Sequence, residues 1–178
     1  MSFQASPCGW ATSSRKPLTR TATLRTVANM TNAVAPALLD VVERHAPEVA
    51  SALSGLHTAM WREMDPALLE LCQWRMAMLH GDDAALPRGP ARTSPEKLAA
   101  LGSWPDSLLF SKKERACLAF TELFVADVSG ITQDDVDAVL AELGPSETYG
   151  FTQSLLFLDQ HQRLVLATAR IFPSEGSA

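Results

Sequence analysis

One predicted helix carries an acid and an imidazole that are candidates for acid–base chemistry. Glu70 lies inside the run Leu68-Leu69-Glu70-Leu71, where a carboxylate must face solvent, pair with a cation or hold a proton. His80 follows ten residues later, which in an ideal helix is about 15 Å along the axis and about 80° around it. We therefore expect Glu70 and His80 to border one cleft without touching. Either group could act as a general acid or base there.

Each of these residues also has a structural interpretation. Glu70 could be a helix-surface acid paired with Arg62 or Arg75. His80 could simply stabilise a helix C-terminus, where a positive charge interacts favourably with the helix dipole. His57 and Trp61, one turn apart, are expected on the outer side of their helix.

Three further basic groups would suit an anionic substrate. They are His161 and Arg163 near the C-terminus and Arg88 in a proline-containing segment. Asp82 and Asp83 resemble half of a metal site, but no His or Glu is spaced to complete it, and a solvated turn is the simpler interpretation. A subunit contact would explain His161, Arg163 and Arg88 equally well, so the two roles stay open.

The cysteines are too far apart in sequence to form a recognisable redox or zinc motif. Cys8, Cys72 and Cys117 show neither CxxC nor CxxH spacing. Cys72 lies on an apolar helix, where cysteine is usually a small core residue rather than a nucleophile. We predict no metal, no cofactor and a reducing cytoplasmic location.

Composition excludes several classes of protein. The chain has 178 residues, 47% of them hydrophobic, and a net charge of −5, which disfavours nucleic-acid binding. No apolar run approaches the roughly 20 residues of a membrane span. Residues 1–30 are basic, with four Lys and Arg and no acid, and are predicted to be a flexible leader, a mis-assigned start before Met30 or, least of the three, a targeting segment. The ordered domain is expected over residues 31–173, with 174–178 as a tail.

Helical periodicity runs through the rest of the chain. A short helix is expected after Asn32, and a second helix from Pro47 has an apolar stripe. Asp65 and Pro66 suit the N-terminus of a third, central helix that ends at Gly81. The stripe of the second helix comprises Val49, Leu53, Leu56, Met60 and Met64.

Turn and capping signals divide the remainder. Residues 82–93 contain two prolines and a glycine and should interrupt the helices. Ser94 starts a short helix, Ser111 with Glu114 forms a capping box, and Thr132 starts a helix ended by Gly144. A last long helix is expected over 146–171. No segment alternates with period two, so no sheet is predicted.

The order of these segments resembles the carboxymuconolactone decarboxylase and alkylhydroperoxidase-D family. The likeness covers roughly residues 33–172 and is carried by three segments together. They are the core helix DPALLELCQWRMAMLHG at 65–81, the run LFSKKERACLAFTE at 109–122, and DQHQRL at 159–164.

The resemblance implies a helical bundle and also reveals a departure from the family. Redox-active members carry two cysteines and a histidine just after the core helix, which together turn over peroxide. Matched position by position, this sequence has Asp82 and Ala85 at the cysteines and Gly89 at the histidine. Glu70 alone falls on the position of the family's relay glutamate.

We therefore predict an all-α, alkylhydroperoxidase-D-like bundle of about six or seven helices. The resemblance implies a homo-oligomer, such as a trimer or hexamer. The favoured function is a family member without thiol peroxidase activity. The first alternative is a cofactor-free acid–base enzyme, of decarboxylase or lactone chemistry, acting on a small carboxylated substrate. The second is a binding module for an apolar ligand, suggested by Met60, Trp61, Trp74, Met76 and Met78.

Overall fold

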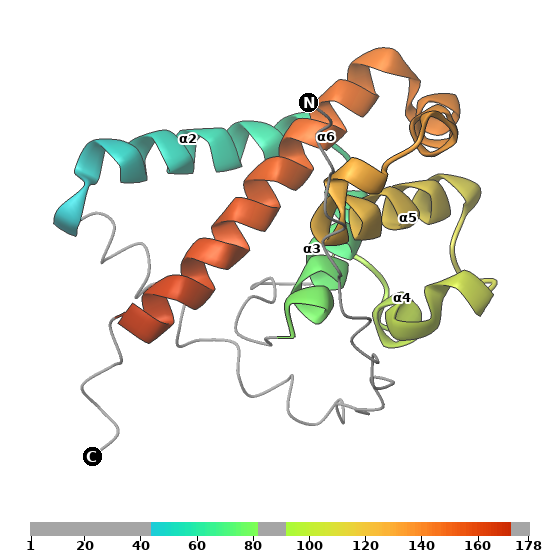
Figure 1. Ribbon diagram of the computed structural model, residues 1–178, viewed down its shortest axis with the longest axis horizontal. Helices are drawn as coiled ribbons and strands as arrows, with labels where there is room; N and C mark the ends of the chain where they lie inside the picture. Colours follow the sequence, from blue (N-terminus) through green and yellow to red (C-terminus); the bar gives the residue numbers. More distant parts are fainter. Residues whose placement is uncertain (1–43, 82–91, 172–178) are drawn as a thin grey trace, which may run out of the picture.

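The described part of the chain is helical. The computed structural model describes residues 44–81 and 92–171, and no strand occurs within these two ranges. Figure 1 shows the helices grouped around α3, with the long α6 crossing the molecule. In chain order the elements are α2 (Pro47–Glu63), α3 (Pro66–His80), α4 (Pro95–Ala100), the 3-10 helix η3 (Leu101–Asp106), α5 (Lys112–Ala126), the 3-10 helix η4 (Val128–Gly130) and α6 (Gln133–Ile171).

The ends of α3 are set by its sequence. The Asp65 side chain accepts hydrogen bonds from the amides of Ala67 and Leu68, and Pro66 occupies the first helical position. At the other end Gly81 adopts a left-handed conformation, with φ of 70°, which only glycine reaches without strain. Both predicted boundaries of this helix are confirmed.

The other capping signals are confirmed as well. Ser111 and Glu114 form both hydrogen bonds of a capping box at the start of α5. The Ser94 side chain accepts from the Lys97 amide at the start of α4. Gly144, with φ of 75° and followed by Pro145, breaks α6 into two segments. The predicted helix end at Gly144 and the predicted start of the next helix directly after it are therefore confirmed.

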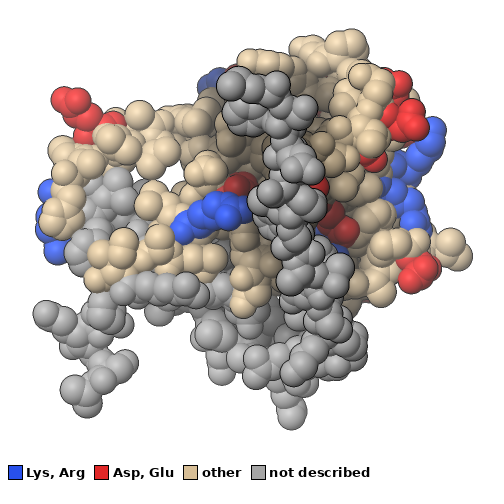
Figure 2. Space-filling view, in the orientation of Figure 1, with Lys and Arg blue, Asp and Glu red and all other residues tan. Residues whose placement is uncertain are grey.

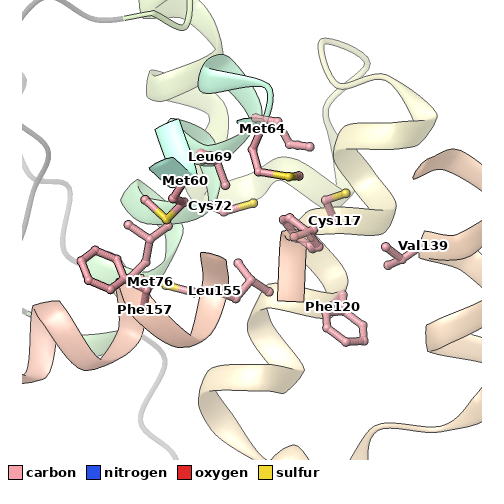
Figure 3. Packing of buried hydrophobic residues seen from close by; sticks show 13 residues of the cluster. Met60, Met64, Leu69, Cys72, Met76, Cys117, Phe120, Val139, Leu155 and Phe157 are labelled. Atoms are coloured by element: carbon pink, nitrogen blue, oxygen red, sulfur yellow. The ribbon is translucent and has the colours of Figure 1, made fainter. Parts of the chain in front are cut away.

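The core surrounds α3, as its apolar sequence predicted. Seven of its residues are buried, and α2, η3, α5 and α6 all contact it. Figure 3 shows the larger core cluster, in which side chains of α2, α3, α5 and α6 meet. Its fully buried members include Leu69, Cys72, Met76, Phe151 and Leu155.

The apolar stripe of α2 differs from the prediction. Only its C-terminal part is buried, at Met60 and Met64, whereas Val49 and Leu56 are 53% and 52% exposed. Figure 1 shows the reason: α2 meets α6 near the C-terminal end of α2, and the two helices diverge from there. The expected helix after Asn32 lies outside the described residues, as do the leader and residues 82–91.

No helix in the described ranges is long and apolar enough to cross a membrane.

Candidate functional site

A histidine, an aspartate and an arginine form a polar cluster between α3 and α6. His80 Nε2 lies 3.0 Å from Asp159 Oδ1, and Arg163 Nε donates to Asp159 Oδ2 at 2.8 Å. The His80 and Asp159 side chains are each 9% exposed, whereas that of Arg163 is 51% exposed. Because an ionised carboxylate only accepts, the imidazole Nε2–H donates to it, and in a neutral ring the lone pair is then on Nδ1. The cluster thus combines an oriented imidazole with a partly exposed guanidinium.

Asp159 is the member of this cluster that sequence reasoning missed. It stands at the start of the DQHQRL run, four residues before Arg163, where an Asp–Arg pair on one helix face is expected. Its contact with His80 spans 79 positions of sequence. Only the packing of α6 against α3 brings these two residues together.

Glu70 is buried and acts as an acceptor for backbone amides. It is 3% exposed, and its Oε2 accepts from the amides of Arg92 at 2.7 Å and Thr93 at 2.6 Å. The Thr93 hydroxyl in turn donates to the Ala67 carbonyl. These contacts fasten the chain that follows the 82–91 segment to α3, which is a structural role.

The expected ion pairs of Glu70 are wrong. Arg62 pairs with Glu63, and Arg75 pairs with Glu122, which also accepts from the Trp104 indole. The Glu70 carboxylate is buried, and backbone amides rather than a cation donate hydrogen bonds to it.

The predicted site residues do not form one cluster. Glu70 bonds to residues 92 and 93, whereas His80 and Arg163 meet at Asp159. His161 instead stacks on Phe157, with ring centroids 5.8 Å apart. Burial and the nearby His57 lower the pKa of His161. Arg88 lies outside the described residues, as do Asp82, Ala85 and Gly89.

A second group of rings lies between α2, α6 and the segment before α4. Trp61 Nε1 donates to His57 Nε2 at 2.9 Å, and the Arg92 guanidinium carbon lies 4.6 Å from the Trp61 ring centroid. The His57 ring is 6.1 Å from that of Phe157. Trp61 is half-buried under these contacts. His57 is exposed and Trp61 partly exposed, as expected for the outer side of α2, but their rings also contact Phe157 and Arg92.

Both cysteines of the described chain are sealed in the core. Cys72 and Cys117 are fully buried and not joined in a disulfide, and Figure 3 shows them among methionine and aromatic side chains. Burial raises the pKa of Cys72 to about 12, although the Thr121 hydroxyl opposes the shift. Burial and the neighbouring Cys72 likewise raise the pKa of Cys117. Neither thiol is in a state to attack a substrate near neutral pH.

The five residues suggested for apolar-ligand binding do not line one site. Met60 and Met76 belong to the packed core, Trp74 packs against the second core cluster, Trp61 lies beneath Arg92, and Met78 is 41% exposed. An open depression of about 530 Å³ lies beside the break in α6. It is lined by Glu63 and Met64, at the end of α2, and by residues 143–147 and 150.

Charged groups are interspersed on the surface. Figure 2 shows basic side chains beside acidic ones on the visible face. Several form ion pairs, including Lys97–Glu114, Lys112–Glu142 and Lys113–Glu147. Across residues 44–81 and 92–171 no group of three or more His, Cys, Asp and Glu side chains is placed to hold a metal ion. The prediction that the protein uses no metal or cofactor stays a prediction.

Comparison with known proteins shows the fold. No family profile matches the sequence, and no curated protein matches it either. Among solved structures it is similar to a protein of unknown function from Agrobacterium tumefaciens, described as a proposed antioxidant defence protein AhpD. The TM-score is 0.61 at 16% identity, over 76% of this chain and 95% of that one. The chain therefore has the all-α, AhpD-like fold.

Proposed function

We propose that this chain is an AhpD-like family member that does not carry out the dithiol peroxidase reaction. In that reaction a thiolate attacks the peroxide, and a second thiol then resolves the sulfenic acid to a disulfide. The burial of Cys72 and Cys117 in the apolar core is the observation that supports the proposal. The elevated pKa of each thiol keeps it protonated at neutral pH. The aspartate and alanine at the family's cysteine positions point the same way.

Thiol reactivity and peroxide turnover test this proposal together. A Cys8→Ser variant restricts the thiols to the two buried ones. We expect no reaction of that variant with an aromatic disulfide reagent until it is denatured, and two thiols per chain afterwards. The wild-type protein should consume tert-butyl hydroperoxide, with dithiothreitol as donor, no faster than the Cys72→Ala variant. Turnover that disappears in Cys72→Ala would contradict the proposal.

The cluster of His80, Asp159 and Arg163 supports a second candidate function, acid–base catalysis on a small carboxylated substrate. Arg163 has guanidinium N–H groups beyond the one given to Asp159, and half of its side chain is exposed. These groups could bind a substrate carboxylate. His80 Nδ1 would take a proton from an adjacent carbon or return one to it. Asp159 would hold the imidazole in the required tautomer and stabilise its charged form.

Proton exchange provides the sharpest test of the second candidate. Small carboxylated lactones and β-keto acids would be incubated with the protein in deuterated water. Deuterium incorporation next to the carboxylate and loss of carbon dioxide would be followed by NMR. Under this proposal His80→Gln abolishes both signals, whereas Arg163→Met mainly raises the KM. Glu70→Gln is the matched control, because Glu70 lies in a separate network, and it should keep the activity. Equal rates for wild type and His80→Gln would exclude this candidate.

Self-association and a cytoplasmic location remain proposals. Val49 and Leu56 lie seven residues apart on α2 and are both exposed, which supports an interface with another copy of the chain. A double substitution of these residues by Glu should lower the mass measured by light scattering if α2 forms that interface. An unchanged mass would place the contact elsewhere or show a monomer.

A further inference from the structure

A chain of contacts runs from α3 to α2 through a single arginine. Glu70 on α3 accepts the backbone amide of Arg92, and the Arg92 guanidinium lies over the Trp61 ring of α2. Trp61 then donates its indole N–H to His57, one turn earlier on the same helix. The position of α2 relative to α3 thus depends partly on the Trp61 ring staying in place.

The His57 ring also faces α6. Its centroid lies 6.1 Å from that of Phe157, on which His161 stacks at 5.8 Å. The charged or titratable groups that act on His57 in this arrangement are Arg92, from the segment before α4, and His161, from α6. Both are basic. A proton added to His57 therefore meets positive charge and no compensating carboxylate among these groups.

The hydrogen bond to Trp61 requires a neutral imidazole. His57 Nε2 is the acceptor, so its lone pair must be free and the proton must be on Nδ1. Protonation of Nε2 would put two N–H groups opposite each other and place a cation near Arg92. We propose that His57 is a pH-sensitive latch, which holds α2 against α6 and Arg92 while its imidazole is neutral and releases α2 when it is protonated.

The electrostatics of the site agree in sign with this mechanism. Burial and the Arg92 charge lower the pKa of His57 below its ordinary value of 6.5. His57 is already partly exposed in the closed arrangement, and opening would hydrate its ring further and move it away from Arg92. The closed arrangement thus binds a proton less well than an open one. By linkage, a falling pH shifts the equilibrium towards the open arrangement, beginning below pH 6.5.

The release should be local rather than global. In the N-terminal half of α2, Ala50 is buried and Leu53 packs partly against the core, but Val49 is about half exposed, as is Leu56 in the middle of the helix. Met60 and Met64 anchor the C-terminal end of α2 in the core. Helices with few buried contacts open at a lower free energy than the whole domain unfolds. The α5 helix, which packs against both α3 and α6, should stay closed.

Hydrogen exchange of the full chain at pH 7.5 and pH 5.0 tests the latch. Rates are corrected for the intrinsic pH dependence of exchange, and peptides from 112–126 of α5 serve as the internal reference. We expect the opening of residues 47–63 to rise about tenfold at the lower pH, the size of the effect of one lost hydrogen bond. His57→Gln keeps an acceptor for Trp61 but cannot be protonated, so the exchange of residues 47–63 relative to α5 should be independent of pH.

Two results would overturn the proposal. One is a wild-type α2 that exchanges no faster, relative to α5, at pH 5.0 than at pH 7.5. The other is a pH response that survives in His57→Gln, including one that disappears only in His161→Gln. Circular dichroism at both pH values confirms that each variant is folded, so that a loss of structure is not mistaken for an open latch.

Discussion

Glu70 can be tested as a structural acceptor by replacing it with residues that keep or remove its hydrogen bonds. Its carboxylate accepts two backbone amides, from Arg92 and Thr93, and the Thr93 amide is in a buried setting. A hydrogen bond to a charged group contributes about 1.5–3 kcal/mol, and a buried amide left without an acceptor costs about 1–3 kcal/mol. Because the two bonds share one carboxylate oxygen and Arg92 is partly exposed, we expect Glu70→Ala to lower the free energy of unfolding by about 3–4 kcal/mol.

The matched variant Glu70→Gln retains a carbonyl oxygen of similar size and position. It can still accept both amides, so it should lose only the extra strength of a charged acceptor, about 1–2 kcal/mol. Urea denaturation followed by circular dichroism measures both variants, with an unchanged m-value confirming a comparable transition. A loss below about 1 kcal/mol for Glu70→Ala would refute the anchoring role. A stable Glu70→Gln variant that had lost an activity of the wild type would instead favour acid–base catalysis by Glu70.

Four further outcomes follow from the geometry. Gly144→Ala should lower the free energy of unfolding by about 1–2 kcal/mol, because a φ of 75° is strained for any residue with a side chain, even where space is free. Gly55→Ala, with open space in the middle of α2, should raise it by about 0.5–1 kcal/mol. Thermal unfolding of the two variants measures both changes. Cys117→Ser should cost about 1–3 kcal/mol by placing a hydroxyl in the apolar core, measured by urea denaturation. Asp159→Asn should raise the reactivity of His80 towards diethyl pyrocarbonate, because the amide holds the imidazole less firmly. The lowered pKa of His161 means that the folded state binds fewer protons than the unfolded state, so wild-type stability should fall as pH drops below 6.5, and less so in His161→Gln.

The helical framework could be predicted because its signals are local. Asp65 and Gly81 act on the amides and carbonyls within one turn of themselves, and so does the Ser111 capping box. The periodicity of α3 predicted its central position correctly. The stripe of α2 failed as a predictor of burial because periodicity reports which face is apolar and not what covers it. Val49 and Leu56 are on the expected face, but about half of each side chain is exposed.

The polar contacts could not be predicted from the same signals. Glu70 binds amides 22 and 23 positions away, and His80 binds a carboxylate 79 positions away. Both contacts depend on how far apart the helices lie and how they are rotated. The sequence suggested Arg62 or Arg75 as partners of Glu70 because they are cations nearby in the chain. Its actual partners are backbone amides, which every residue except proline has, so the residue types could not indicate them.

Two buried carboxylates, those of Glu70 and Asp159, hold α3 in position. Glu70 ties its first half to the chain entering α4, and Asp159 ties its last residue, His80, to α6. Between them Cys72 is enclosed by the core on all sides. A thiol peroxidase needs its sulfur at the accessible end of such a helix, where a thiolate is solvated and a resolving thiol can approach. In this chain that end holds His80, with an acid that orients it and a guanidinium beside it. These three groups are suited to proton transfer, which is the reaction that we propose for them.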